Sequence, residues 1–134
     1  MSNEKTILPT INPKKTVDII SRFIKDKIEG SKSEGLVVGL SGGIDSSVVT
    51  YIAAQAVSRD KILGLVMPSE TTATEDVQDA LSIAEVLGIK KKIIPIDHIL
   101  EVFNTLTVDS TSDEQYQLAQ ANLKARIRMM ILYY

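Results

Sequence analysis

The chain has 134 residues, of which 44% are hydrophobic and 24% are charged. These proportions are typical of one globular domain and exclude a disordered or fibrous protein. The net charge of -2 gives no general basic field for nucleic acid or a membrane surface, and the absence of cysteine excludes disulfides, cysteine zinc sites and a cysteine nucleophile. The N-terminus lacks the apolar segment of a signal peptide, and no apolar run approaches the roughly 18 residues of a membrane span. We therefore expect a cytoplasmic protein that binds neither nucleic acid nor membrane.

The first predicted elements are a tail, a helix and a buried strand. Residues 1–11 form the tail. Asn12 and Pro13 suit the N-cap and the first position of a helix, whose apolar residues recur at helical spacing until Gly30 offers an end. The apolar run over residues 35–40 is bounded by glycine and predicts a buried strand.

The middle of the chain repeats this alternation of strand and helix. A helix is predicted directly after the first strand, and a second strand over residues 62–67 stops at Pro68. Residues 72–75 have the sequence of a capping box and predict a helix start, with Gly88 at the end of that helix. A third apolar run, residues 93–96, contains a proline and predicts an edge strand or a strand end.

The last third of the chain is predicted to be largely helical. Residues 99–106 form a short helix and residues 107–113 a polar loop. The final helix runs over residues 113–134 with an apolar stripe of Leu118, Ala121, Ala125, Met129 and Leu132. One helix, three strand–helix units and a long helix imply an α/β fold, a parallel sheet with helices on both faces.

The end of the final helix bears on domain organisation. Residues 129–134 are apolar and carry neither a capping glycine nor a polar tail, and three strands are few for a sheet of this kind. We therefore expect residues 12–134 to be the N-terminal part of a larger, here incomplete, domain. The alternative is that a partner chain covers these apolar residues.

The most informative segment is Gly39-Leu40-Ser41-Gly42-Gly43-Ile44-Asp45-Ser46-Ser47, between the first strand and the next helix. Unpaired backbone N–H groups and the positive end of the helix dipole meet there, and serine hydroxyls add donors, so the segment suits phosphate oxygens. Its spacing fits neither the Walker A loop nor G-x-G-x-x-G. Asp45 would repel a phosphate unless a cation lay between them, which makes Asp45 a candidate Mg²⁺ ligand.

Two other interpretations fit parts of this segment. Residues 39–43 satisfy G-x-S-x-G, the nucleophile elbow of α/β-hydrolases, with Ser41 as nucleophile and His98, the only histidine, as base. The simpler interpretation is a tight Gly-Gly turn followed by a helix that Asp45 and Ser46 cap. The elbow leaves Asp45 and Ser46 unexplained.

These residues also resemble a known family. Residues 41–46, SGGIDS, resemble the S-G-G-x-D-S loop of ATP pyrophosphatases, which cleave ATP between the α- and β-phosphates and adenylate a substrate. Within that group, Met67-Pro68-Ser69 and the NLKARIRM sequence of residues 122–129 resemble the M-P-S and N-x-x-A-R-x-R-M segments of the ammonia-dependent NAD synthetases. The resemblance implies the Rossmann-like adenine nucleotide alpha hydrolase fold. It also implies an incomplete active site, because the family's later segments supply further ATP, metal and substrate contacts.

The resemblance implies a reaction and a set of site residues. The carboxylate of deamido-NAD attacks the α-phosphorus of ATP and pyrophosphate leaves; ammonia then displaces AMP from the adenylate to give NAD. No protein nucleophile is needed. The implied contacts are Mg²⁺ at Asp45, deamido-NAD at Arg126, and ATP at Gly39, Leu40, Ser41, Gly42, Gly43, Ile44, Asp45, Ser46 and Met67. Arg128 points about 200° away from Arg126 around a helix, so the two cannot share one ligand face.

The family further implies a homodimer that acts on small molecules: ATP, deamido-NAD and ammonia. Two alternatives stay open. One is another adenylating ligase or amidotransferase of the same superfamily, such as a GMP synthetase-like enzyme. The other is a non-catalytic nucleotide-binding fragment, because part of the family's active site lies beyond the segments matched.

Overall fold

The computed structural model describes residues 10–106 and 113–134. Most of the predicted tail and the predicted polar loop, residues 107–113, therefore lie outside the described residues. Along the chain the elements are α1 (Pro13–Ser31), β1 (Leu36–Leu40), α2 (Ile44–Ala56), the short 3-10 helix η1 (Arg59–Lys61), β2 (Ile62–Val66), α3 (Thr74–Leu87), β3 (Lys90–Ile93), α4 (Asp97–Asn104) and α5 (Asp113–Tyr133). The predicted order of elements is confirmed.

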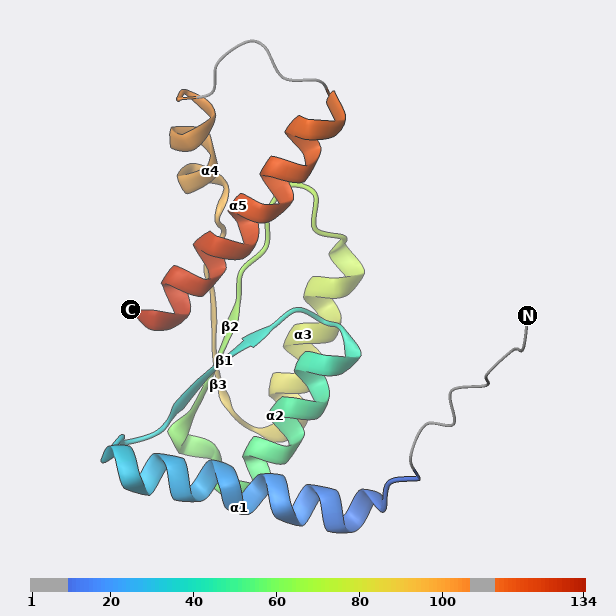
Figure 1. Ribbon diagram of the computed structural model, residues 1–134, viewed down its shortest axis with the longest axis vertical. Helices are drawn as coiled ribbons and strands as arrows, with labels where there is room; N and C mark the ends of the chain where they lie inside the picture. The colour runs from blue at the N-terminus through green and yellow to red at the C-terminus, as the bar shows by residue number, and fades with distance from the viewer. Residues whose placement is uncertain (1–9, 107–112) are drawn as a thin grey trace, which may run out of the picture.

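The three strands form one parallel sheet in the order β1-β2-β3. Figure 1 shows the strands between α2 and α3 on one side and α4 and α5 on the other. Leu36 pairs with Ile62 at the start of β1, and Leu40 pairs with Val66 at its end. Because the strands are parallel, the carboxyl ends of β1 and β2 lie at the same edge of the sheet, where ligands of open α/β sheets bind.

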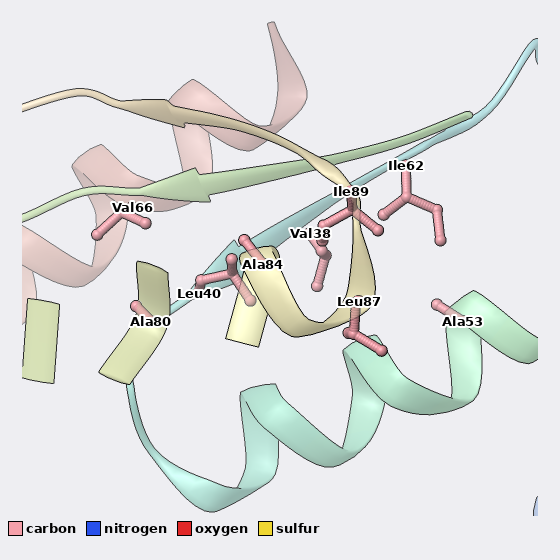
Figure 2. Close-up of a cluster of buried hydrophobic side chains, with 9 residues drawn as sticks. All are labelled: Val38, Leu40, Ala53, Ile62, Val66, Ala80, Ala84, Leu87 and Ile89. Carbon is pink, nitrogen blue, oxygen red and sulfur yellow. The ribbon is translucent and has the colours of Figure 1, made fainter. Parts of the chain in front are cut away.

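One face of the sheet packs against α2 and α3. Successive side chains of a strand point to opposite faces, and on this face Val38, Leu40, Ile62 and Val66 are buried. Figure 2 shows them together with alanine and leucine side chains of the two helices and with Ile89. The alanines allow the helices to approach the sheet closely. α1 packs in turn on α2 and contributes the half-buried Ile24 to this core.

The opposite face of the sheet packs against α4 and α5. There Leu65 and Met67 form a second buried cluster with three residues from beyond the sheet: Ile96, Leu100 of α4 and Ile127 of α5. Helices therefore cover both faces, as predicted. Within the described ranges, none of the helices is long and apolar enough to cross a lipid bilayer.

Two predicted helix boundaries are wrong. α1 does not end at Gly30 but continues to Ser31, and Lys32 adopts the left-handed conformation that closes it. The predicted capping box at residues 72–75 is absent, because Ala73 is the N-cap of α3 and no side chain bonds that cap. The Thr72 hydroxyl instead accepts the backbone N–H of Ser69 at 3.0 Å, which stabilises the loop before the helix. Gly88 closes α3 in a left-handed conformation, as predicted.

The third strand lies three residues earlier than predicted. β3 covers Lys90–Ile93, and its three lysines are all exposed at the edge of the sheet. Pairing with β2 determines this strand, whereas the prediction relied on an apolar run. The apolar stripe predicted for α5 is also on the wrong side: Leu118 and Met129 are exposed, and Ile127 is the buried contact with the sheet.

Candidate functional site

The loop after β1 contains a position that only glycine can occupy. Gly42 has a φ of +82°, a region that L-amino acids rarely adopt, and a Cβ there would lie 2.3 Å from the carbonyl oxygen of Asp76. The loop therefore turns sharply and lies directly against the first turn of α3. This packing fixes where α2 begins and where its amino end faces.

The amino end of α2 is open. Gly43 is the N-cap with extended backbone, and it has no side chain to cap the amides that follow. The first intrahelical bond is from the Ser47 N–H to the Gly43 carbonyl, at 3.2 Å. Within the described ranges, no acceptor takes the N–H groups of Ile44, Asp45 or Ser46. Ile44 and Asp45 are exposed, so this end of the helix is open to solvent and suits an anion.

The serine hydroxyls shape this loop. The Ser46 hydroxyl donates to the Gly43 carbonyl at 3.0 Å and lies 3.0 Å from the Ser41 hydroxyl. Ser46 uses its proton on Gly43, so Ser41 is the donor in the serine pair. The Ser41 oxygen accepts in turn from the Gly43 N–H at 3.3 Å. These bonds hold the loop in a fixed form while the helix amides stay uncovered.

The hydrolase interpretation finds no support in this geometry. The Ser41 hydroxyl bonds to Ser46, and no base contacts it among the described residues. The His98 side chain is 94% exposed, and its Nδ1 lies 3.4 Å from a carboxylate oxygen of Glu101. Ser41 therefore lacks the hydrogen-bonded histidine that a nucleophile elbow requires.

A cavity of about 360 Å³ adjoins the loop at the carboxyl ends of β1 and β2. It has a size typical of small-molecule sites, which occupy roughly 300–1,000 Å³. Its walls come from both strands, from α3 and from α5. The lining residues are Gly39, Leu40, Ser41, Val66, Met67, Pro68, Thr72, Asp76, Val77, Arg128 and Leu132. Four residues of the predicted ATP set therefore lie on one cavity: Gly39, Leu40, Ser41 and Met67.

Asp45 lies in the first turn of α2, exposed, beside the open amides. Within residues 10–106 and 113–134, no cluster of three or more histidine, cysteine or acidic side chains is arranged to hold a metal ion. A metal at this point would therefore have fewer than three such side chains from the described chain. This fits Mg²⁺, which is commonly held by one or two carboxylates together with substrate phosphates and water.

The two arginines of α5 face different surroundings, as their spacing predicts. Arg126 is exposed, and its Nη1 donates to the Asn122 carbonyl of its own helix at 3.2 Å. Arg128 is half-buried and lines the cavity, and its Nε donates to the Met67 carbonyl at 3.0 Å. The role of Arg126 in binding deamido-NAD stays a prediction.

Sequence reasoning missed several cavity residues. Thr72, Asp76 and Leu132 reach the cavity only through the packing of α3 and α5 against the strand ends. Thr72 did carry a signal, but its pattern matched a helix cap. Nothing local in the sequence links the end of α5 to β2.

Comparisons with known proteins agree with one another. The family model described as NAD synthase matches residues 16–134. The NH(3)-dependent NAD(+) synthetase of Methanocaldococcus jannaschii is 48% identical over 118 residues, which are 88% of this chain and 45% of that protein.

Two solved structures share the fold. The NH3-dependent NAD synthetase of Campylobacter jejuni superposes with a TM-score of 0.82 at 33% identity, over 92% of this chain and 52% of that one. An NMN synthetase from Francisella tularensis has the same TM-score and identity, over 92% and 50%. The chain thus spans about half the length of the relatives it matches. With a family match over nearly its whole length, the chain belongs to the NAD synthase family.

Proposed function

We propose that this chain supplies the ATP-binding part of an enzyme that amidates deamido-NAD to NAD with ammonia. One observation carries the proposal: the uncovered amides at the start of α2 adjoin a ligand-sized cavity between the ends of β1 and β2. Membership of the NAD synthase family supports the choice of substrate. The names of the relatives support ammonia as the nitrogen source.

The phosphates of ATP would bind at the loop. The N–H groups of Ile44, Asp45 and Ser46 point out of the amino end of α2 and have no acceptor within the described chain. Pyrophosphate is the leaving group of the proposed first step, so negative charge grows on the β-phosphate as the bond breaks. Fixed amide donors at a helix N-terminus stabilise that charge without reorganising.

The rest of the nucleotide would occupy the cavity. Leu40, Met67 and Val77 give it apolar walls suited to a purine, and Gly39 has no side chain to fill it. Met67 is 7% exposed and belongs to the core of the second sheet face, so this wall is held rigidly. A rigid wall beside the phosphate loop keeps the α-phosphorus within reach of an attacking carboxylate.

Asp45 would hold Mg²⁺ bound to the phosphates. The ion would offset the phosphate charge, which would otherwise repel the carboxylate of Asp45, a residue whose own amide is one of the donors. No protein nucleophile enters the proposed reaction, in keeping with the absence of cysteine and the exposure of His98. Arg126, exposed on α5, would bind an anionic group of deamido-NAD from outside the cavity.

Calorimetry tests nucleotide binding directly. We expect the chain to bind ATP in the presence of MgCl₂, and we expect Asp45→Asn to remove the gain in affinity that Mg²⁺ gives. Asp26→Asn, which changes an exposed carboxylate of α1, is the matched control and should bind as the wild type does. An Asp45→Asn variant that keeps the full Mg²⁺ effect would overturn the metal assignment. No ATP binding by the wild type would overturn the proposed function.

A second candidate substrate follows from the similarity to the NMN synthetase of Francisella tularensis. That name indicates amidation of a mononucleotide in place of a dinucleotide. Turnover assays with ATP, ammonium and either deamido-NAD or nicotinate mononucleotide separate the two, and xanthosine monophosphate tests the GMP synthetase-like alternative. Binding of ATP without turnover of any of the three would indicate a nucleotide-binding fragment.

We also propose that the protein acts as a homodimer in the cytoplasm. Apolar side chains on and beside α4 and α5 line a cavity of about 370 Å³ that includes Phe103, Met130 and Tyr134. These three side chains are exposed within the described chain, and a second copy would cover them. Sedimentation equilibrium tests this proposal, and a monomer at every concentration would refute it.

A further inference from the structure

The chain just beyond the carboxyl end of β2 lacks the hydrogen-bonding partner that a longer β1 would give it. Backbone groups of successive residues point to opposite sides of a strand. On the β3 side, the carbonyls of Val66 and Pro68 accept the N–H groups of Ile94 and Ile96 at 2.8 and 2.9 Å. The carbonyl of Met67, between them, therefore points toward β1.

β1 cannot supply a donor at this point. Its pairing with β2 ends at Leu40 and Val66, because the chain turns away into the Ser41 loop. The Met67 carbonyl lies at a core position, in a residue that is 7% exposed, so leaving it without a partner would be costly. Arg128 fills the place: its Nε donates to this carbonyl at 3.0 Å, across 61 residues of sequence.

Arg128 also stands at the cavity wall. It is half-buried and lines the cavity between the strand ends, together with Met67 and Pro68. No carboxylate within residues 10–106 and 113–134 forms an ion pair with it. The guanidinium thus donates the hydrogen bond that a neighbouring strand would otherwise give to Met67. The cavity lies beside this bond.

We propose that Arg128 is a positioning residue for the nucleotide, an inference that rests on the proposed ATP site. Its Nε fixes the Met67 carbonyl, and with it the Met67-Pro68 wall against which the nucleotide lies. The bond holds the Met67 carbonyl in place just beyond the last paired residues of β1 and β2. The role belongs to the donor at Nε rather than to the positive charge.

Three substitutions separate the donor from the charge. Arg128→Gln places an amide nitrogen at the position of Nε and removes the charge. Arg128→Lys keeps the charge but has a methylene at that position, and Arg128→Met has neither. We expect ATP–Mg²⁺ to bind the Lys and Met variants about tenfold more weakly, as one lost carbonyl hydrogen bond implies, and the Gln variant nearly as well as the wild type. Arg22→Met, an exposed change on α1, is the control for loss of an arginine.

The outcomes distinguish the inference from the function on which it rests. Calorimetry gives the dissociation constants, and thermal melting followed by circular dichroism gives the stability of each variant. If Lys binds like the wild type while Gln is weakened, Arg128 acts by charge and the inference is wrong. Equal binding by all variants, with or without a loss of stability, also overturns it. A wild-type chain that binds no ATP refutes the proposed function itself.

The hydrogen bond can also be tested without ATP by NMR, with the carbonyl carbon of Met67 labelled with ¹³C. Its resonance should shift in Arg128→Met and Arg128→Lys and stay in place in Arg128→Gln. A resonance unmoved in all three would contradict the hydrogen bond and refute the inference independently of nucleotide binding.

Discussion

Replacing Gly42 by alanine tests the turn that directs the amino end of α2 toward the cavity. The new Cβ meets two separate obstacles. The backbone φ of +82° is unfavourable for an L-residue, and the Cβ would lie 2.3 Å from the carbonyl oxygen of Asp76. Gly88 provides a matched control, because its φ of +64° is also positive but a Cβ there has nothing within 4 Å.

The two obstacles have different magnitudes. The left-handed conformation costs alanine about 1–2 kcal/mol, and both variants incur that cost. The contact at Gly42 is with backbone, which cannot rotate away as a side chain can, so the loop or α3 must shift. Overpacking of this kind costs about 1–3 kcal/mol more. We therefore expect Gly42→Ala to lower the free energy of unfolding by about 2–5 kcal/mol, and Gly88→Ala by about 1–2 kcal/mol.

Urea unfolding followed by circular dichroism measures both values. The difference between the two variants isolates the contact with Asp76 from the conformational cost. If Gly42→Ala is no less stable than Gly88→Ala, the loop does not lie against α3 as described, and the reasoning is refuted. If Gly42→Ala loses ATP binding at temperatures where the variant is still folded, the packing of Gly42 against Asp76 also determines the geometry of the proposed ATP site.

Three further outcomes are expected. Gly30→Ala should raise the free energy of unfolding by about 0.5–1 kcal/mol, because Gly30 lies inside α1 and an added Cβ has nothing within 4 Å; a loss in urea unfolding would contradict this. Ile127→Ala should lower it by about 2–5 kcal/mol, since the side chain is 2% exposed in the second core; a loss below about 1 kcal/mol would show that α5 is not docked there. The hydrogen bond and the charge of Lys91 lower the pKa of Glu85, so an NMR titration should find it below that of an ordinary glutamate, and Lys91→Met should raise it. A lowered pKa stabilises the folded state above the ordinary glutamate pKa and loses that effect as the pH falls through the lowered value, so Lys91→Met should change stability least in acid.

The sequence predicts the strand–loop–helix junction around Gly42 because its signal is local. The positive φ of Gly42 and the hydrogen bonds of Ser41 and Ser46 lie within the loop itself. The parallel sheet also follows from the alternation of apolar runs and helical stripes. In each case, the signal lies in neighbouring residues.

Other features depend on contacts between distant segments and could not be read in this way. β3 is a strand because its backbone pairs with β2, although its lysines give no apolar pattern. α5 is apolar on more than one side, so its periodicity does not select the side that Ile127 buries. The contact of Arg128 with Met67 spans 61 residues and leaves no trace in the local sequence.

The exposed lysines of β3 have a consequence for handling the protein. An unpaired strand edge invites another copy to add to the sheet, and here like charges would meet if two such edges approached each other. Repulsion of this kind weakens as dissolved ions screen it, within about 10 Å at 0.1 M salt. Concentrated stocks should therefore stay clear longest in dilute buffer, and turbidity should increase as salt is added.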